Sequence, residues 1–185
     1  MSVKDNLRRE LKQKRKAVEE KDQKDKAICN LLQSLEPYNN ADLILFYAAL
    51  SDEINTDFAI ENALRCGKKV ALPVCTDKNG SMCFYYIRSL ADVKTGYFGI
   101  REPDVNICKK VTDFSNSVCI VPAISFDRRG YRLGYGKGYY DRFLQNYTSL
   151  SVGLCYNELI TDLLPNDKYD ISVNYIISED GIISV

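Results

Sequence analysis

Short apolar runs and segments with helical periodicity alternate along the chain. Residues 43–47 and 69–74 are mostly apolar, the pattern of strands that are buried on both faces of a parallel sheet. Residues 57–66, which lie between them, predict a helix that Thr56 caps and Gly67 ends. A strand, a helix and a strand in this order predict a βαβ unit with parallel strands.

The rest of the chain continues this alternation. Further strands are expected at residues 83–87, 118–122, 151–155 and 173–177, and a helix at residues 138–145. Residues 89–116 contain Gly96, Gly99 and Pro103 and show little periodicity, so we expect loops and short elements there. We find no internal repeat and no linker between domains.

Two helices are expected before the first strand. The first lies within residues 1–26, where Ser2 can cap its start and a thin apolar stripe is formed by Leu7, Leu11 and Val18. The second shows the i, i+3, i+4, i+7 pattern of an amphipathic helix, formed by Ile28, Leu31, Leu32 and Leu35. Pro37 is expected to end this second helix.

The length and composition of the chain are those of one domain. It has 185 residues, 45% of them hydrophobic, and a chain of this size buries roughly two-thirds of its unfolded surface. Together with the alternating pattern, this predicts an α/β fold, a three-layer α/β/α Rossmann-like domain with a mostly parallel central sheet. We expect residues 1–185 to form a single domain.

Charge and cysteine content narrow the range of partners and compartments. Because 25 basic residues balance 25 acidic ones, no overall field favours nucleic acid or an anionic membrane. No apolar run approaches the roughly 18 to 20 residues of a membrane span. Seven cysteines without a C-x-x-C pair suit neither a disulfide framework nor a zinc ribbon. We therefore expect a cytoplasmic protein whose partner is a small molecule. A monomer is a separate expectation.

The chain contains no histidine. This absence removes the usual general base near neutral pH and the commonest metal ligand. Catalysis by Ser-His-Asp or Cys-His groups is excluded, and so are metals held by histidine. Any metal should be a hard ion bound by carboxylates, with Mg²⁺ as the first candidate.

A glycine-rich turn lies within residues 121–144, between a predicted strand and a predicted helix. Gly134, Gly136 and Gly138 lack β-carbons, so backbone N–H groups there can approach phosphate oxygens closely. The N-terminus of the helix that follows adds positive potential. Ligands of open α/β sheets bind at this kind of junction.

Charged side chains beside these glycines fit a triphosphate. Arg132 and Lys137 add two positive charges, and Asp141 offers a carboxylate to a phosphate-bound Mg²⁺. The turn is not a Walker A loop, because Gly138 follows Lys137 where that loop has Ser or Thr. A tight connection with solvated charges is the alternative interpretation. It leaves the clustering unexplained.

Residues 122–141 closely resemble the signature of the 5-formyltetrahydrofolate cyclo-ligase family. The resemblance covers nearly the whole chain, in four blocks that keep the family's order: Lys4 to Arg8, Glu53-Ile54-Asn55-Thr56, the glycine-rich segment, and Leu164-Pro165 followed by Asp170. It implies an enzyme that uses ATP and Mg²⁺ to convert 5-formyltetrahydrofolate to 5,10-methenyltetrahydrofolate, with release of ADP and phosphate.

The resemblance also implies which residues form the site. The family's ATP contacts fall on Lys4, Arg8, Arg132, Leu133, Gly134, Tyr135, Gly136, Lys137, Gly138, Tyr139 and Tyr140. Its folate contacts fall on Ala48, Glu53, Tyr135, Gly136, Lys137, Gly138 and Tyr139, and its Mg²⁺ ligands on Asp141 and Asp170. Arg132 and Lys137 are the expected catalytic residues, since they can neutralise charge on the transferring phosphoryl group.

Each of these residue types also has an ordinary structural explanation. Lys4 and Arg8 share a helix face that would otherwise be read as solvated, and Glu53 could simply complement a helix dipole. The chain departs from the family pattern at two places. Tyr169 stands where the family often has histidine, and the expected pocket wall that begins at Ala48 starts with two small side chains. Two other functions are alternatives: a ligase or kinase with another substrate, and a single-stranded RNA binder that stacks bases on the tyrosines.

Overall fold

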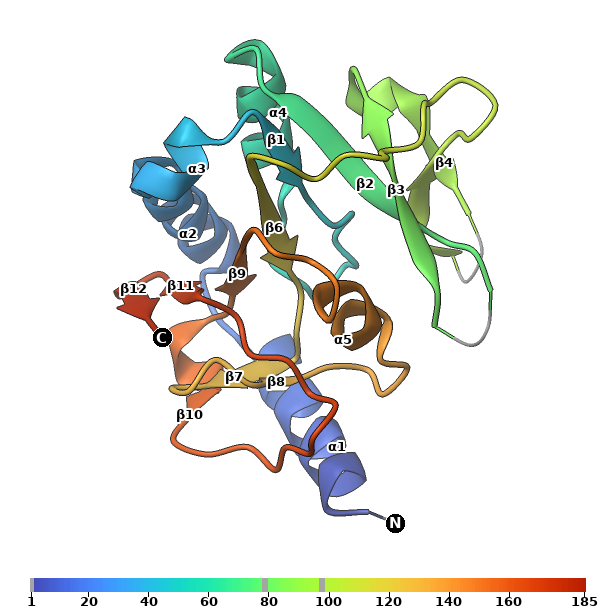
Figure 1. The fold of residues 1–185 in the computed structure, drawn as a ribbon. Coiled ribbons are helices and arrows are strands. Elements are labelled where there is room, and N and C mark those ends of the chain that lie inside the picture. The colour runs from blue at the N-terminus through green and yellow to red at the C-terminus, as the bar shows by residue number, and fades with distance from the viewer. Residues whose placement is uncertain (1, 78–79, 97–98) are drawn as a thin grey trace.

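A seven-stranded mixed sheet forms the centre of the fold (Figure 1). The computed structural model describes residues 2–77, 80–96 and 99–185. The strand order is β12–β11–β9–β6–β1–β2–β3, with these bounds: β1 Leu43–Leu45, β2 Lys69–Cys75, β3 Met82–Ile87, β6 Ser117–Val121, β9 Leu150–Leu154, β11 Tyr175–Ser178 and β12 Gly181–Ser184. The strands from β11 to β2 are parallel, whereas the edge strands β3 and β12 are antiparallel to their neighbours. The predicted mostly parallel sheet is confirmed.

Helices cover both faces of this sheet. Their bounds are α1 Val3–Lys16, α2 Lys21–Ser34, α3 Glu36–Asn40, α4 Asp57–Arg65 and α5 Tyr139–Leu144. Helix α2 contacts both α3 and α4, and Figure 1 shows α2 and α3 on one side of the central strands with α5 on the other. Helix α1 belongs to neither layer, because it lies beyond the carboxyl end of β6 (Figure 1). The α/β fold predicted from the sequence is therefore observed.

Two smaller sheets and two short 3₁₀ helices complete the described structure. One sheet has the order β10–β7–β8, formed by Ile160–Thr161, Ser125–Asp127 and Arg132–Leu133. The other pairs β4 (Val93–Thr95) with β5 (Arg101–Pro103), and the 3₁₀ helices are η1 (Leu90–Asp92) and η3 (Asn157–Leu159). The sequence pattern predicts neither the three-stranded sheet nor β12, because none of their strands contains more than two consecutive apolar residues.

The N-terminal helices differ from the prediction in two ways. The polypeptide turns between α1 and α2, where Glu20 adopts a left-handed conformation with φ of 54°, so Val18 lies between two helices. Pro37 does not simply end a helix, because it occupies the first turn of α3, where a missing N–H group costs nothing. The predicted Ser2 cap is present as a capping box, with Asp5 as its reciprocal partner.

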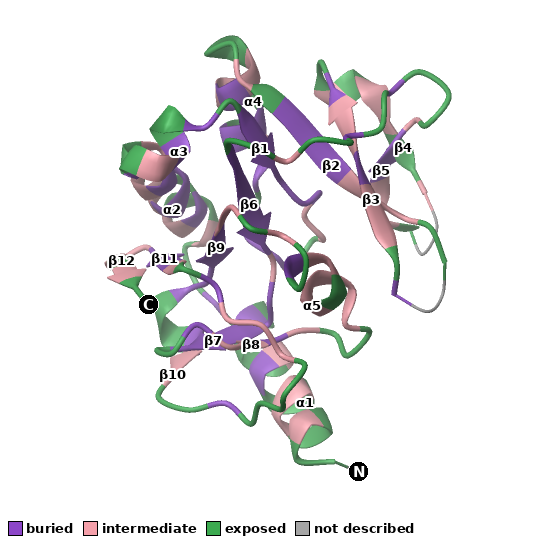
Figure 2. Ribbon diagram, viewed as in Figure 1, coloured by how far each residue is buried: buried purple, intermediate pink, exposed green. Residues whose placement is uncertain are grey.

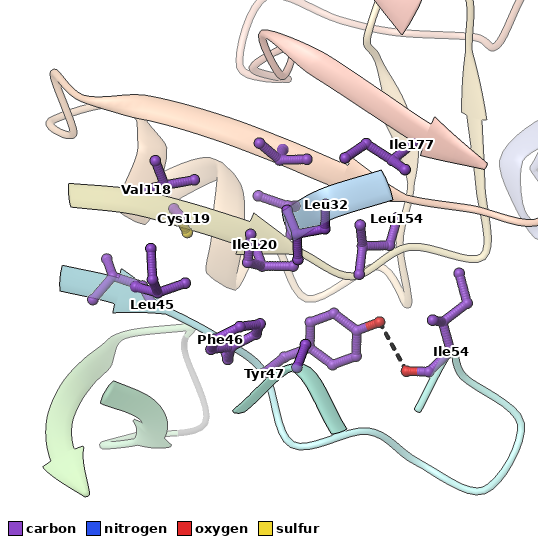
Figure 3. Packing of buried hydrophobic residues seen from close by; sticks show 14 of the residues in the cluster. Leu32, Leu45, Phe46, Tyr47, Ile54, Val118, Cys119, Ile120, Leu154 and Ile177 are labelled. Atoms are coloured by element: carbon purple, nitrogen blue, oxygen red, sulfur yellow. Dashed lines mark hydrogen bonds between the residues drawn. The ribbon is translucent and has the colours of Figure 1, made fainter. Parts of the chain in front are cut away.

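The predicted βαβ unit is confirmed, but its helix begins differently. Strands β1 and β2 are parallel and α4 lies between them in sequence. Thr56 precedes α4 without capping it, because its hydroxyl donates to the carbonyl of Tyr47 at 2.8 Å. The hydroxyl of Tyr47 donates in turn to the carbonyl of Ile54 at 3.0 Å (Figure 3). These two bonds hold the segment between β1 and α4 in place.

A continuous hydrophobic core lies between the sheet and its helices (Figure 2). Leu32 of α2 packs beside Ile120, Leu154 and Ile177 of the central strands (Figure 3). Burying one such side chain contributes roughly 1.5 to 3 kcal/mol. Gly153 in β9 permits a close approach, since a β-carbon there would lie 2.3 Å from the ring of Phe126. The core therefore links the central sheet to β7, next to the glycine-rich turn.

Among the described residues, no helix is both long enough and apolar enough to cross a membrane. All seven cysteines fall within the described ranges, and each is a free thiol. The expectation that the cysteines do not form a disulfide framework is thus consistent with the structure.

Candidate active site

Helix α1 is tied to two loops that lie far from it in the sequence. Nε of Arg8 donates to the carbonyl oxygen of Gly134 at 2.9 Å, across 126 residues. Nζ of Lys4 lies 2.7 Å from the carboxylate of Asp170 and 3.2 Å from that of Asp167. The expected phosphate ligands of α1 are thus brought to the glycine-rich turn and to the C-terminal loop, the segment of residues 162–174 between β10 and β11.

The glycine-rich turn needs its glycines for conformation and for space. Gly136 and Gly138 have φ values of 91° and 68°, in the left-handed region that glycine adopts without strain. A β-carbon at Gly136 would lie 3.2 Å from the guanidinium carbon of Arg8, and at Gly134 no atom lies within 4 Å. Lys137, which lies between Gly136 and Gly138, is exposed. The turn thus leaves room for a ligand beside two cationic side chains.

Arg132 holds the start of α5 against the C-terminal loop. Its guanidinium donates to the carboxylate of Asp141 at 2.5 Å and to the carbonyl of Ile171 at 2.6 Å. The amide of Ile171 donates back to Asp141 at 3.2 Å. Because Asp170 directly precedes Ile171, the two expected metal ligands lie on neighbouring segments.

The acidic residues of this corner fit a magnesium ion that is bound mainly through phosphate. Among the described residues, no group of three His, Cys, Asp or Glu side chains converges on one point. Mg²⁺ commonly uses one or two carboxylates and takes its remaining ligands from phosphate and water. Asp141 and Asp170 supply that donor set, each now paired with a cation, Arg132 and Lys4 respectively.

Glu53 lies behind the turn, in the segment that follows β1. It is 7% exposed, and its carboxylate accepts from the amide of Leu50 and from the hydroxyl of Tyr135, each at 2.9 Å. Burial raises the pKa of Glu53 above the ordinary value, and these two hydrogen bonds lower it. Ala48 is buried in the same segment. Tyr135 thus joins the expected phosphate and folate regions.

The three tyrosines of the turn lie in different environments. Tyr135 is 41% exposed, whereas the hydroxyl of Tyr140 is buried and has no partner among the described residues. The hydroxyl of Tyr139 donates to the carbonyl of Asp77 at 2.8 Å, which directs it toward the end of β2. Leu133 is buried, so only its backbone can meet a ligand. Of the three side chains, that of Tyr135 is the most exposed, and the ammonium group of Lys12 lies 4.6 Å from the centre of its ring.

Sequence reasoning missed Arg15, which the structure places behind Tyr135. Its guanidinium donates to the hydroxyl of Tyr135 at 2.6 Å and to Asp52 at 2.6 Å. A signal was present, because residues 4, 8, 11 and 15 follow the i, i+4, i+7, i+11 spacing of one helix face. Buried Leu11 on that face indicates that it points inward.

Comparison of the sequence with known proteins identifies its relatives. The model of the 5-formyltetrahydrofolate cyclo-ligase family matches residues 1–179. The 5-formyltetrahydrofolate cyclo-ligase of Saccharomyces cerevisiae is 30% identical over 181 residues, covering 84% of each chain. The Escherichia coli K12 protein of the same name is 26% identical over 178 residues, covering 93% of this chain and 98% of its own.

A solved structure has a similar fold. The 5,10-methenyltetrahydrofolate synthetase of Aquifex aeolicus is 29% identical and superposes with a TM-score of 0.86, covering 99% of this chain and 93% of its own. The family match spans α1, Glu53, the glycine-rich turn and Asp170, the four segments that the tertiary structure brings together. The chain therefore belongs to the 5-formyltetrahydrofolate cyclo-ligase family of enzymes.

Proposed function

We propose that this enzyme converts 5-formyltetrahydrofolate to 5,10-methenyltetrahydrofolate, using ATP and Mg²⁺ and releasing ADP and phosphate. The observation that carries the proposal is that α1 contacts the glycine-rich turn through Arg8 and Gly134 and contacts Asp170 through Lys4, in a chain that matches the family over residues 1–179. Three separate segments supply opposite charges to one corner, as a metal–triphosphate site requires.

In the proposed reaction both nucleophiles belong to the substrate. The formyl oxygen attacks the γ-phosphate of ATP, and ADP leaves. N10 then attacks the resulting iminium phosphate carbon, and inorganic phosphate leaves as the new ring closes. The protein needs no histidine, since its task is to position the reactants and to neutralise charge.

The ATP site in this proposal is built from the turn and from α1. Backbone N–H groups of Gly134 to Gly138 face the phosphates, and the side chains of Lys4, Arg8 and Lys137 pair with them. Lys137 is exposed and not held by an ion pair among the described side chains, so it is free to follow the transferring phosphoryl group. Arg132, paired with Asp141, would stabilise the same charge.

Asp141 and Asp170 would hold Mg²⁺ when ATP is bound. The ion would supply positive charge at the phosphate oxygens, which lowers the cost of the charge that develops during phosphoryl transfer. Lys4 and Arg132, which now pair with these carboxylates, would be left free for phosphate oxygens. The site can therefore exchange its internal ion pairs for pairs with the ligand.

The folate site in this proposal lies between Glu53 and the turn. The carboxylate of Glu53 accepts hydrogen bonds in one plane, which suits the donor edge of a pterin ring. Tyr135 is partly exposed and would stack on the ligand once Lys12, which now lies over its ring, moves aside, and Ala48 lines the wall. Gly136, Lys137, Gly138 and Tyr139 complete the set. We also propose that the protein is a cytoplasmic monomer and that residues 1–185 form one domain.

The test is to mix purified protein with 5-formyltetrahydrofolate, Mg²⁺ and ATP and to follow the absorbance band of methenyltetrahydrofolate. The band should grow only when ATP is present, with ADP released in equal amount. ADP release that does not depend on the folate would favour another ligase or kinase. Retention of single-stranded RNA that weakens with salt would favour the RNA-binding alternative.

A further inference from the structure

A buried arginine lies directly behind the proposed folate site. The side chain of Arg15, in the last turn of α1, is only 2% exposed. Its guanidinium donates to Asp52 at 2.6 Å, to the hydroxyl of Tyr135 at 2.6 Å and to the carbonyl of Ala123 at 3.0 Å. It also lies 5.6 Å from the centre of the Tyr135 ring. One side chain therefore holds the ring and the hydroxyl of the same tyrosine.

The hydrogen bonds from Arg15 to Glu53 run in one direction. A guanidinium can only donate, so the hydroxyl of Tyr135 accepts from Arg15 and must turn its own proton elsewhere. That proton points to the carboxylate of Glu53, 2.9 Å away. The second oxygen of Glu53 accepts from the amide of Leu50. Arg15 thus fixes the proton of Tyr135 on Glu53, and the remaining lone pairs of the carboxylate stay available to a ligand.

Arg15 also determines the charge balance around Glu53. The titratable groups that face Glu53 are Arg15 from α1, Tyr135 from the turn, Asp52 from its own loop, Tyr47 after β1 and Tyr140 from α5. Burial raises the pKa of Glu53, and Arg15 is the one cation in this set that lowers it. The ionised carboxylate is the form that accepts hydrogen bonds in one plane.

Arg15 itself is too deeply buried to meet a substrate. A cavity of about 10 Å³ lies between its guanidinium, Glu53 and Tyr47, which is room for roughly one water molecule. Nε of Arg15 has no hydrogen-bond partner within the described parts of the chain. The effect of Arg15 on a ligand must therefore pass through Tyr135 and Glu53.

We propose that Arg15 is a positioning residue for the folate: it orients Tyr135 and keeps Glu53 as a carboxylate, without touching the substrate. This inference rests on the proposed function. The pterin end of the substrate would bind at Tyr135 and Glu53, whose side chains are oriented by Arg15 of α1. The same helix carries Lys4 and Arg8 toward the phosphates.

The test compares Arg15→Gln, Arg15→Lys and Tyr135→Phe with the wild type in the absorbance assay. Arg15→Gln should raise the KM for 5-formyltetrahydrofolate by roughly tenfold or more, because it leaves buried polar groups unpaired. The KM for ATP should stay nearly unchanged. The acid limb of kcat/KM for the folate should move to higher pH, since the pKa of Glu53 rises without the cation. Arg15→Lys should keep the acid limb near its original pH.

Tyr135→Phe and Arg9→Gln are the companion variants. Tyr135→Phe removes only the hydroxyl, so it should shift the acid limb in the same direction even if Arg15→Gln fails to fold. Arg9→Gln changes an exposed arginine of the same helix and should alter neither KM nor the pH profile. Thermal unfolding of each variant reports whether the fold is kept.

The outcomes separate this inference from the proposed function. An active wild type whose acid limb does not move in either Arg15→Gln or Tyr135→Phe overturns the role of Arg15. A change in both KM values together, without the pH shift, does so too, because it indicates a purely structural role. A folded wild type that forms no methenyl product under any condition refutes the proposed function itself.

Discussion

The ammonium group of Lys4 lies 2.7 Å from the carboxylate of Asp170, although 166 residues separate the two in the sequence. Both groups are only partly buried, and such pairs contribute little to stability, about 0 to 1 kcal/mol. The position of this ion pair therefore matters more than its contribution to the stability of the fold. It brings a cation and an anion to the corner where our proposal puts a magnesium–triphosphate ligand.

Replacing Lys4 should therefore weaken ATP binding more than it weakens the fold. Lys4→Gln is expected to raise the KM for ATP by roughly tenfold, as the loss of one charge-assisted phosphate contact would do. The melting temperature should change little. Steady-state kinetics against ATP would check this, with Lys14→Gln as the control, since Lys14 is an exposed lysine of α1 that pairs with Glu10 of the same helix. Equal effects of the two variants would argue against a phosphate role for Lys4.

Replacing Asp141 should change the dependence on Mg²⁺. Asp141→Asn keeps the shape of the side chain but removes its charge, so the Mg²⁺ concentration that gives half-maximal activity should rise several-fold or more. A titration with MgCl₂ at saturating ATP measures this. Asp162→Asn is a suitable comparison, because the side chain of Asp162 is fully exposed. An unchanged Mg²⁺ curve for Asp141→Asn would remove Asp141 from the metal site.

Gly136 can be tested against a second glycine of similar conformation. Gly136 and Gly67 have φ values of 91° and 79°, but only Gly136 faces Arg8, and a β-carbon at Gly67 would meet no atom within 4 Å. Alanine at either position should cost about 1 to 2 kcal/mol of unfolding free energy through backbone strain. Only Gly136→Ala should also raise the KM for ATP. Chemical denaturation and kinetics together distinguish strain from crowding of the site.

Lys137 should matter for turnover and not for folding. Its side chain is exposed, so Lys137→Ala should leave the melting temperature unchanged within error. If it neutralises charge on the transferring phosphoryl group, kcat should fall by roughly 100-fold or more. Lys109→Ala, another exposed lysine, should have no such effect. Full activity of Lys137→Ala would exclude it from the catalytic groups.

Thiol labelling should follow burial. Burial raises the pKa of Cys29 to about 11 and that of Cys155 to about 12, so both stay protonated and unreactive at pH 8. Cys66 is exposed and should react first with iodoacetamide. Mass spectrometry of the native and the urea-unfolded protein would show this order. Rapid labelling of Cys155 in the native protein would contradict the buried position of this residue, directly after β9.

Much of the fold could be predicted because its main elements lie in strongly patterned segments of the sequence. The apolar runs that became β1, β2 and β6, and the helix α4 between the first two, each carry their own signal. The three-stranded sheet β10–β7–β8 could not be predicted, since each of its strands contains only one apolar residue, whereas β1 begins an unbroken apolar run from residue 43 to 47. Thr56 illustrates the limit at one residue: its type suits a cap, but the nearby carbonyl of Tyr47 binds its hydroxyl instead.

The sequence by itself determined the family, the glycine-rich turn and the candidate residues, because these depend on residue type and order along the chain. Only the tertiary structure decided which of them meet. Arg8 reaches Gly134, Lys4 reaches Asp170 and Tyr135 reaches Glu53 across 82 to 166 residues, and no local pattern encodes such contacts. They form because the core places α1 at the carboxyl end of the sheet, where the buried Arg15 finds its partners.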